Sequence, residues 1–255
     1  MMEKTLIRLL VLMIFSLHAF SQPPGTVELY KNFYVDETEV TNQHWKDYQT
    51  WTLNHLGDTS EEYKLTIVKQ DVWKETLNRP FEKEYYKNIA FRDYPVVGIS
   101  YEQAIAYCKW RTDRVNEYIH IQSSKELRKN YDSDSIYKAP IVYTYRLPSK
   151  EEFIRYSVPS YTKKNKKARK KQDIKLGNFG AKEGYTTAPV ISYFPNIFGI
   201  YNSLGNVNEL INEKGIALGG SYLTKSIDLN KIEQIEYDKP SSTIGFRCVA
   251  EKINK

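Results

Sequence analysis

The sequence predicts a protein of mixed α and β structure, built from short elements. Three capping patterns, at Thr41, Ser100 and Ser149, mark the starts of helices. Runs rich in β-branched and aromatic residues lie before, between and after these helices and indicate strands. Aromatic residues make up 14% of the 255 residues, which is enough to fill a core and excludes a disordered chain.

The first elements are a strand and a helix. Residues 27–36 (VELYKNFYVD) indicate a strand or one arm of a hairpin. Thr41 can cap a helix that runs to about Leu56 and ends at Gly57. One face of this helix is expected to be buried, because its large residues recur at three-to-four spacing: Trp45, Tyr48, Thr52 and Leu56.

The middle of the chain alternates between irregular and regular segments. Residues 58–94 are polar and irregular, and we expect an insertion on the surface. Ser100 and Gln103 form a capping box that opens a helix to about Tyr118. The buried stripe of this helix is expected to hold Tyr101, Ala104, Ile105, Cys108 and Val115.

The rest of the chain is predicted to hold strands and one short helix. Strands are expected at 141–146, 188–193 and 244–250. Ser149 and Glu152 form a second capping box, which opens a helix to about Ser157.

The N-terminus has the features of an export signal. Two basic residues precede an apolar stretch, Leu9 to Phe15, and Ala19-Phe20-Ser21 provides small residues for a cleavage site. We expect cleavage after Ser21, so that residues 1–21 are a signal peptide and residues 22–255 a single domain, exported to the periplasm or cell envelope or secreted. The apolar stretch is too short to span a bilayer, and an uncleaved membrane anchor is the alternative. No cysteine follows it for a lipid anchor, and no transmembrane segment is expected after cleavage.

Cys108 and Cys248 are the only cysteines. In an exported protein such a pair suggests one disulfide, and two buried free thiols are the alternative. The bridge would close a long loop, worth roughly 5 kcal/mol in the chain-entropy model before any strain is subtracted.

Residues 163–171 (KKNKKARKK) form a dense basic run. Like charges at this density repel and cannot be buried, so the run is expected in a solvent-exposed loop. It can also attract an anionic surface, such as phosphate groups, lipid headgroups or an acidic polymer. An export signal contradicts a nuclear role for this run, and no nucleic-acid partner is expected.

The stretch from Phe194 to Tyr222 concentrates glycine turns and oxygen donors. Four glycines in it can adopt backbone angles closed to other residues: Gly199, Gly205, Gly219 and Gly220. Between them lie the side-chain oxygens of Asn202, Asn206, Asn208 and Glu209. Tight turns and convergent oxygens are what a loop around a hard cation needs.

Seven segments, in this order, resemble the formylglycine-generating enzyme or sulfatase-modifying factor domain. They are VDETEVTNQHW at Val35, YPVVGISYEQAIAYCKW at Tyr94, YRLPSKEEF at Tyr145, TAPV at Thr187, FGIYNSLGNVNEL at Phe198, LGGSY at Leu218 and IGFRCVAE at Ile244. The resemblance covers most of residues 30–251 and implies an α+β fold, the formylglycine-generating-enzyme variant of the C-type lectin fold, with much irregular structure. It also implies a disulfide between Cys108 and Cys248, because the family pairs these positions. The WRTDRVNE run at Trp110, together with DETEVTN at Asp36 and the Trp73 region ahead of YPVVG, resembles the bacterial gliding-motility and type IX secretion proteins that carry this domain.

The resemblance bears on copper chemistry. The family's reaction uses copper held by two thiolates, and the resemblance places those positions on Thr224 and Leu229. A hydroxyl and an isobutyl group cannot replace two soft sulfur ligands. We therefore expect no copper and no formylglycine formation. Ser221, where the family has an oxygen-side serine, is expected to be a turn residue.

The resemblance also implies two calcium sites. The first falls on Asn202, Gly205, Val207 and Glu209, and the second on Asn178, Phe179, Glu183 and Tyr185. Asn and Glu would offer side-chain oxygens, and Gly and Val backbone carbonyls. With few carboxylates, the sites should be weak and suited to millimolar calcium. The alternative is that Asn202 and Glu209 only hydrogen-bond the turn.

Two functions from different classes remain open. The first is an exported, non-catalytic structural or interaction protein of the bacterial cell envelope, of the gliding-motility or type IX secretion type, whose partner is an envelope protein or peptide. The second is a metal-dependent oxidase or oxygenase on the same fold, for example with non-haem iron. It needs two histidines and a carboxylate to meet, and the mature chain has His44, His55 and His120 in separate elements.

Overall fold

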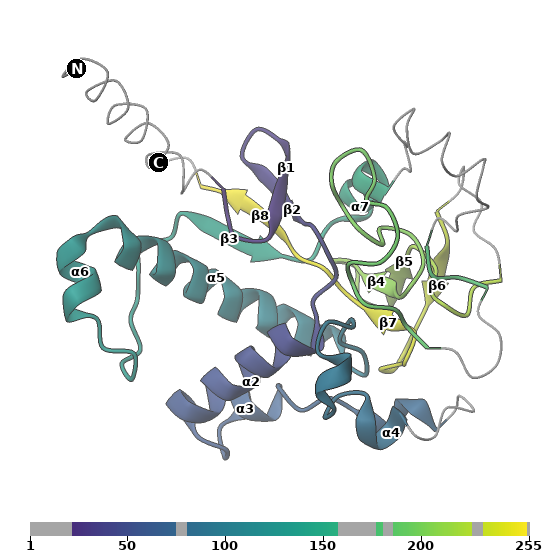
Figure 1. The fold of residues 1–255 in the computed structure, drawn as a ribbon, viewed down its shortest axis with the longest axis horizontal. Coiled ribbons are helices and arrows are strands. Elements are labelled where there is room, and N and C mark those ends of the chain that lie inside the picture. The colour runs from purple at the N-terminus through teal and green to yellow at the C-terminus, as the bar shows by residue number, and fades with distance from the viewer. Residues whose placement is uncertain (1–21, 75–80, 158–176, 181–185, 226–231, 254–255) are drawn as a thin grey trace, which may run out of the picture.

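Two four-stranded sheets and two long helices form the framework of the part of the chain that the structure describes (Figure 1). The structure is a computed structural model, and it describes residues 22–74, 81–157, 177–180, 186–225 and 232–253. Among these residues, no helix combines the length and the apolar character that crossing a bilayer requires.

The first sheet brings the two ends of the described chain together. Its strand order is β1-β2-β8-β3, with β1 at Thr26–Tyr30, β2 at Phe33–Asp36, β8 at Val249–Lys252 and β3 at Tyr143–Arg146. All neighbouring strands are antiparallel, and Tyr34 of β2 and Tyr145 of β3 both pair with Ala250 of β8. The predicted hairpin arm at 27–36 and the predicted strand at 141–146 are therefore confirmed.

The second sheet is made of short strands from the C-terminal part. Its order is β6-β5-β4-β7, with β6 at Gln234–Glu236, β5 at Ile216–Leu218, β4 at Asn208–Leu210 and β7 at Ile244–Gly245. The β4–β7 pair is parallel. The single strand predicted at 244–250 is divided, because β7 belongs to this sheet and β8 to the first.

The strand predicted at 188–193 is wrong. This segment is irregular, and asparagine side chains replace a neighbouring strand as its partners. Asn206 donates to the carbonyl oxygen of Ala188 at 3.2 Å and accepts from its N–H at 2.7 Å, and Asn202 donates to the carbonyl oxygen of Val190 at 3.0 Å. The Val190 N–H donates to the Asp93 carbonyl oxygen at 2.8 Å, so the backbone groups of Ala188 and Val190 are paired without a ladder.

The helices begin where the capping residues predict. Helix α2 spans Asn42–Leu56 and α5 spans Tyr101–Ser123, five residues beyond the predicted end. Thr41 caps α2 in a capping box that His44 completes, and Ser100 with Gln103 caps α5. A short α6 at Lys125–Asn130 follows α5, and α7 occupies Lys150–Ser157. Ser149 and Glu152 exchange hydrogen bonds of 3.2 and 2.7 Å at its start, so the second predicted capping box is present.

Aromatic packing between α2 and α5 forms the largest core cluster. The Trp45 and Tyr107 rings stack with their centroids 5.6 Å apart, and Phe246 meets both rings edge-on. The predicted stripe of α5 is partly wrong: Ile105 is 40% exposed and Tyr107 takes its place in the core. The long α5 helix turns Ile105 toward solvent because Ala104, Tyr107 and Cys108 already define its inner face.

The insertion at 58–94 enters the core instead of lying only on the surface. It contains α3 (Glu61–Lys64), a 3₁₀ turn η1 (Gln70–Trp73), α4 (Phe81–Glu84) and a second 3₁₀ turn η2 (Ile89–Phe91). Trp73 and Tyr85 are buried in a cluster with Tyr222. The expectation of a surface wrap is corrected, because burying these large rings outweighs the polar composition of the segment.

Candidate functional site

A buried ion pair lies at the centre of the stretch that carries the glycine turns. Arg247 and Glu209 are both almost fully buried, at 0% and 1% side-chain exposure. The Arg247 Nε donates to both Glu209 oxygens at 2.9 and 2.8 Å, and Nη2 donates to Oε1 at 2.6 Å. Burial alone would lower the pKa of Arg247, but the neighbouring Glu209 carboxylate raises it, so the pair is ionised.

The same guanidinium ties its own segment to two other backbone segments. Its remaining N–H groups donate to the carbonyl oxygens of Asp36 at 3.1 Å, Glu37 at 3.4 Å and Tyr201 at 2.9 Å. Tyr201 lies in the glycine-rich stretch, and its N–H in turn donates to the Glu37 carbonyl oxygen at 2.8 Å. Arg247 therefore connects the end of β2, the glycine-rich stretch and the segment between β7 and β8.

A second buried carboxyl group, Glu39, lies beside this pair. Its two oxygens accept from Asn206 Nδ2 at 2.8 Å and from Asn202 Nδ2 at 3.4 Å. Burial raises the pKa of Glu39 to about 8; Glu209 adds to the rise and Arg247 opposes it. At neutral pH this carboxyl group is therefore largely protonated, and it is a neutral hydrogen-bonding group in the centre of the fold.

Asn206 and Asn202 hold the glycine-rich stretch in its shape. Both have positive φ angles, 65° and 45°, which asparagine tolerates better than most residues. The Asn206 side-chain oxygen also accepts from Asn178 Nδ2 at 3.1 Å. At Gly205, whose φ is 82°, an added Cβ would lie 2.9 Å from the Asn178 carbonyl oxygen, so the close approach of these two segments requires glycine.

The two cysteines lie side by side in the core. The sulfur atoms of Cys108, on α5, and Cys248, just before β8, are 3.5 Å apart, and both residues are buried. This separation exceeds the ~2.05 Å of a covalent bridge, so the structure contains two adjacent free thiols. Burial and the neighbouring Cys108 raise the pKa of the Cys248 thiol well above its usual value. The covalent bridge stays a prediction.

A cleft of about 400 Å³ opens between α2, α5 and the 36–40 segment. Its two arginines are paired: the Arg111 guanidinium donates to both Asp36 oxygens at 2.6 and 2.8 Å, and Arg114 pairs with Glu117. Three further acidic residues, Glu37, Glu39 and Asp47, also line the cleft. Aromatic and aliphatic side chains, including Trp110 and Ile191, complete its walls. The cleft can therefore accept an apolar side chain but offers no cluster of metal ligands among the described residues.

The family comparison decides what kind of domain carries this arrangement. The model of the sulfatase-modifying factor enzyme 1-like domain matches residues 12–252. The chain belongs to the sulfatase-modifying factor family. Its fold is accordingly the α+β formylglycine-generating-enzyme variant of the C-type lectin fold.

Individual relatives of this sulfatase-modifying factor domain are distant. The formylglycine-generating enzyme of Bos taurus is 24% identical over a match that covers 87% of this chain and 66% of the bovine protein. The chain thus spans less than two thirds of that relative's length. The solved structure of CarF has a TM-score of 0.50 at 20% identity, with 87% of each chain covered. Variable protein 1 of Treponema denticola is similar at a TM-score of 0.46 and 16% identity, over 91% of this chain and 92% of that chain.

Of the two positions that the resemblance assigns to copper ligands, Thr224 lies in a turn. Thr224 Oγ1 accepts from the Ser221 N–H at 2.9 Å, and the Thr224 N–H donates to the Ser221 carbonyl oxygen at 2.9 Å. The Thr224 carbonyl oxygen accepts from the Gly180 N–H at 2.7 Å. Thr224 and Ser221 therefore close the turn after the double glycine. Leu229 lies outside the described residues.

The predicted calcium ligands are only partly free to bind a cation. Asn202 Oδ1 is buried and has no hydrogen-bond partner among the described residues, which favours the first site. Glu209, the only carboxylate of that set, has both oxygens engaged by Arg247, so this set does not fit calcium as it stands. Gly205 and Val207 lie between them on the same stretch.

The second predicted calcium set can be followed for half of its members. Asn178 Nδ2 donates to the Thr186 carbonyl oxygen at 3.1 Å, and the Asn178 carbonyl oxygen accepts from the Asn206 N–H at 2.7 Å. The Phe179 ring lies against Gly205. Glu183 and Tyr185 fall outside the described residues.

The three histidines have separate structural partners. His44 Nδ1 accepts from the Thr41 N–H in the α2 cap. The His55 ring nitrogens lie 2.8 and 3.0 Å from the carbonyl oxygens of Trp51 and Ser133, and His120 lies 3.3 Å from the Tyr137 hydroxyl. Within the described ranges no three His, Cys, Asp or Glu side chains are grouped as a metal site. The described histidines therefore offer no support for an iron triad.

Sequence reasoning missed the two residues that organise this centre, Glu39 and Arg247. The signal for Arg247 was present, because it is a lone charge within the apolar run IGFRCVA, and a buried arginine requires a buried acid. No comparable signal singles out Glu39 from the neighbouring Glu37.

Proposed function

We propose that this protein is a non-catalytic member of the sulfatase-modifying factor family, an exported structural or interaction protein of the bacterial cell envelope. The observation that carries the proposal is the turn at Thr224, whose hydroxyl oxygen accepts a hydrogen bond from the Ser221 N–H. Copper chemistry would need a thiolate at the Thr224 position. Leu229 supplies no metal-binding atom at the other position. The two cysteines of the chain, Cys108 and Cys248, lie side by side in the core, and neither belongs to this turn.

The partner proposed is an envelope protein or peptide, in an assembly of the gliding-motility or type IX secretion type. The cleft beside Trp110 and Ile191 supports this, because its two arginines are paired with carboxylates and its walls are largely apolar. An apolar side chain of a partner would bury against these walls. Export after cleavage at Ser21 belongs to the same proposal.

Aldehyde formation is the direct test of the missing catalytic function. The purified chain is incubated with copper, oxygen and a sulfatase-type peptide that contains the reactive cysteine, and the peptide is examined for aldehyde by mass spectrometry. We expect none, with an active formylglycine-generating enzyme as the positive control. Aldehyde on the peptide would refute the proposal.

Metal analysis separates the proposal from an oxidase or oxygenase function. Protein purified without added metal is examined for calcium, iron and copper. Calcium alone, or no metal, agrees with an interaction protein. Stoichiometric iron or copper would overturn the proposal of an interaction protein in favour of a metal-dependent oxidase or oxygenase.

A further inference from the structure

The cleft of about 400 Å³ between α2, α5 and the 36–40 segment carries an excess of negative charge. Its two arginines are balanced by carboxylates, Arg111 by Asp36 and Arg114 by Glu117. No other Lys or Arg among the described residues lines the cleft. Any further carboxylate in the lining is therefore a negative charge without a neighbouring cation.

Glu37 is such a carboxylate, and its backbone is held in place. Its N–H donates to the Gly25 carbonyl oxygen at 3.0 Å, and its carbonyl oxygen accepts from the Tyr201 N–H at 2.8 Å and from Arg247 at 3.4 Å. The side chain is half-buried, and the structure shows no hydrogen bond or ion pair of its carboxylate with another described residue. A half-buried anion without a partner favours the binding of a cation.

Asp47 adds a second carboxylate to the same cleft. It lies on α2, is exposed, and accepts a hydrogen bond from the neutral Gln43 Nε2 at 2.8 Å. The carboxylates of Glu37 and Asp47 thus come from two different elements. Glu39, also in the lining, is largely protonated at neutral pH and adds little charge.

The remaining walls of the cleft are mainly apolar. Tyr107, Trp110 and Val115 of α5 line it, together with Ile191, which is 69% exposed. The Trp110 indole N–H is buried and has no acceptor among the described residues. An occupant that brings apolar surface, a positive charge and a carbonyl oxygen would therefore complement the cleft.

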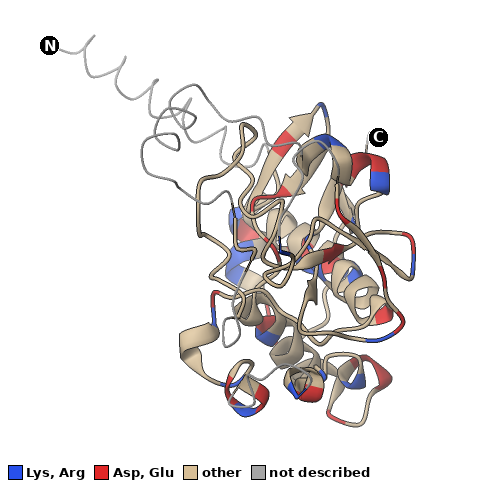
Figure 2. Cartoon of the chain, turned by 90° about the vertical axis from the view of Figure 1, so that its right-hand side faces the viewer, with Lys and Arg blue, Asp and Glu red and all other residues tan. Residues whose placement is uncertain are grey.

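A metal ion does not fit this arrangement. Among the residues that the structure describes, no three His, Cys, Asp or Glu side chains are grouped as a metal site. The negative charge of the cleft lies beside apolar walls, which suits an organic cation with an aliphatic stem. Figure 2 shows acidic and basic residues interspersed over the side of the described chain that it displays, so a cation is directed by the local charges of a cleft rather than by a broad field of one sign.

We propose that this cleft binds a lysine side chain of a partner protein, with the ammonium group at Glu37 and Asp47. The aliphatic stem of the lysine covers the apolar walls, and a backbone carbonyl oxygen beside it accepts from the Trp110 indole. An ammonium group has three donors that rotate, so it can meet two carboxylates from different elements, whereas a guanidinium fork matches one planar carboxylate. This inference rests on the proposed interaction function and deepens it, because it names the residue that the partner contributes.

Peptide titration of the purified protein tests the proposal. The probe is a short blocked peptide with one lysine among alanines, compared with the same peptide in which the lysine is acetylated or replaced by norleucine. Binding is followed by the indole N–H signal of Trp110 in heteronuclear NMR spectra, assigned by its loss in Trp110→Phe. We expect the lysine peptide to shift this signal and to bind about tenfold more tightly than either neutral peptide, because only the ammonium group makes charge-assisted hydrogen bonds.

Three results would overturn the lysine site. Equal binding of the three peptides would mean that the cleft is only an apolar groove. Binding of none of them would leave the cleft without this ligand. Tighter binding of the matching arginine peptide would show that a guanidinium group is preferred. Weaker binding of the lysine peptide at higher salt would support the proposal, because the contact is between charges at a partly exposed site.

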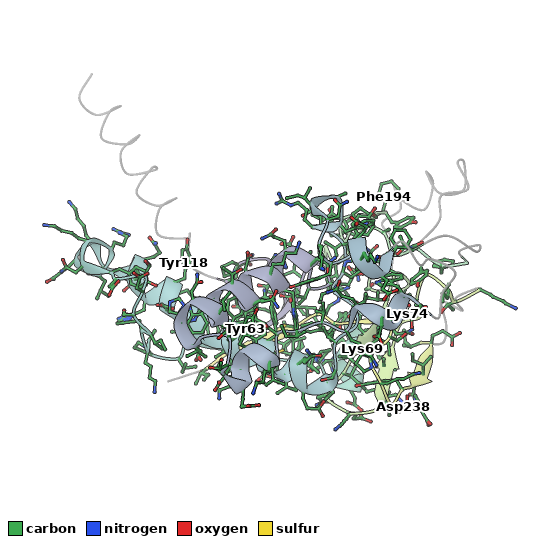
Figure 3. All side chains as sticks on the ribbon, turned by 90° about the horizontal axis from the view of Figure 1, so that it is seen from below. Tyr63, Lys69, Lys74, Tyr118, Phe194 and Asp238 are labelled. Atoms are coloured by element: carbon green, nitrogen blue, oxygen red, sulfur yellow. The ribbon has the colours of Figure 1, made fainter. Side chains whose placement is uncertain are left out.

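Matched variants locate the ammonium group. Glu37→Gln should weaken binding of the lysine peptide about tenfold and leave the norleucine peptide unchanged. Asp47→Asn should have a smaller effect, because its carboxylate is exposed. Asp238→Asn is the control: its carboxylate is exposed, lies outside the cleft lining, and is labelled at the edge of the molecule in Figure 3.

Thermal melting checks that each variant is folded, and Asp47→Asn, at an exposed position, decides the test if Glu37→Gln does not fold. Affinities of both cleft variants equal to that of Asp238→Asn would refute the proposal. The aldehyde assay does not depend on this cleft. A protein that forms no aldehyde and binds no lysine peptide would therefore refute only the lysine site, and one that forms aldehyde and binds the peptide would refute only the loss of catalysis.

Discussion

Arg247 and Glu209 form a forked ion pair in the interior, with Nη2 only 2.6 Å from Oε1 and neither side chain more than 1% exposed. The pair joins β4 to the segment before β8, and the spare N–H groups of Arg247 reach the carbonyl oxygens of Asp36 and Tyr201. In a domain with much irregular chain, one buried guanidinium thus connects segments that no strand pairing joins.

Removing one member of this pair should destabilise the fold strongly. Glu209→Gln leaves the Arg247 charge buried without its carboxylate, and such a change costs about 3–5 kcal/mol. Arg247→Lys keeps the charge but loses the fork and most of its acceptors, so it should be nearly as damaging. Urea unfolding of both variants, with Glu61→Gln on the exposed α3 helix as control, measures this. Losses below 1 kcal/mol would show that the pair is not structural.

Glu39 should make stability depend on pH. Its pKa is raised from 4.5 to about 8 in the folded protein, so between these values the folded state binds more protons than the unfolded state. The contribution of Glu39 to the free energy of unfolding is therefore fully present below about pH 4.5 and is lost as pH rises toward 8. The total loss is a few kcal/mol, and above the folded-state pKa the free energy of unfolding no longer changes through this group. Comparing the unfolding free energy of the parent and Glu39→Gln from pH 5 to 9 isolates the effect. A parallel pH dependence in both proteins would contradict it.

Local signals explain which parts of the fold could be predicted. The starts of α2, α5 and α7 follow from the hydroxyl groups of Thr41, Ser100 and Ser149, because a cap satisfies backbone N–H groups within one turn. The ends are less determined, and α5 continues to Ser123 because its last turns have no breaking residue before Ser124.

Long-range polar contacts explain what could not be predicted. The segment at 188–193 has the composition of a strand, yet its hydrogen bonds go to the Asn202 and Asn206 side chains and to the Asp93 carbonyl oxygen, which no local pattern reveals. Glu39 meets Asn206 across 167 positions of sequence. The family resemblance located Asn202 and Glu209 in the centre, but whether they hold a cation or a guanidinium depends on Arg247, which comes from another segment.

The adjacent thiols lead to a redox prediction. If Cys108 and Cys248 are bridged in the exported protein, reduction should lower stability by about 2–5 kcal/mol, because the unfolded chain regains the freedom of a long loop. Cys108→Ser should cause a similar loss and remove any further effect of reductant. The melting temperature with and without dithiothreitol, together with thiol titration of denatured protein, measures this. Two reactive thiols in protein kept under oxidising conditions would show that no bridge forms.

Calcium binding can be tested at the side chain with the free oxygen. Asn202 Oδ1 is buried without a partner among the described residues, so Asn202→Leu removes the one side-chain oxygen of the first predicted calcium site that is not already hydrogen-bonded. If calcium binds, a chelator should lower the stability of the parent by about 1.4 kcal/mol at tenfold saturation, and Asn202→Leu should not respond. Thermal unfolding in millimolar calcium and in chelator gives the comparison. A parent protein that does not respond would leave Asn202 and Glu209 with the structural role that the turn alternative gives them.

Gln103 shows how one side chain can serve both a cap and an insertion. Its Oε1 accepts from the Ser100 N–H at 2.8 Å, while its Nε2 donates to the carbonyl oxygens of Leu65 at 3.0 Å and Ile67 at 2.7 Å. Gln103→Glu preserves the capping acceptor but places a carboxylate against two carbonyl oxygens, leaving these acceptors without a donor.

We expect Gln103→Glu to lose about 1–3 kcal/mol at neutral pH and to recover part of this under mildly acidic conditions, where the protonated carboxyl group can donate a hydrogen bond. Gln103→Ala, which loses both functions, should show no such recovery. Hydrogen exchange of the 65–69 segment distinguishes a local release of the insertion from global unfolding. If Gln103→Glu matches the parent at neutral pH, the contacts with Leu65 and Ile67 do not hold the insertion, and the buried Trp73 and Tyr85 rings alone anchor it.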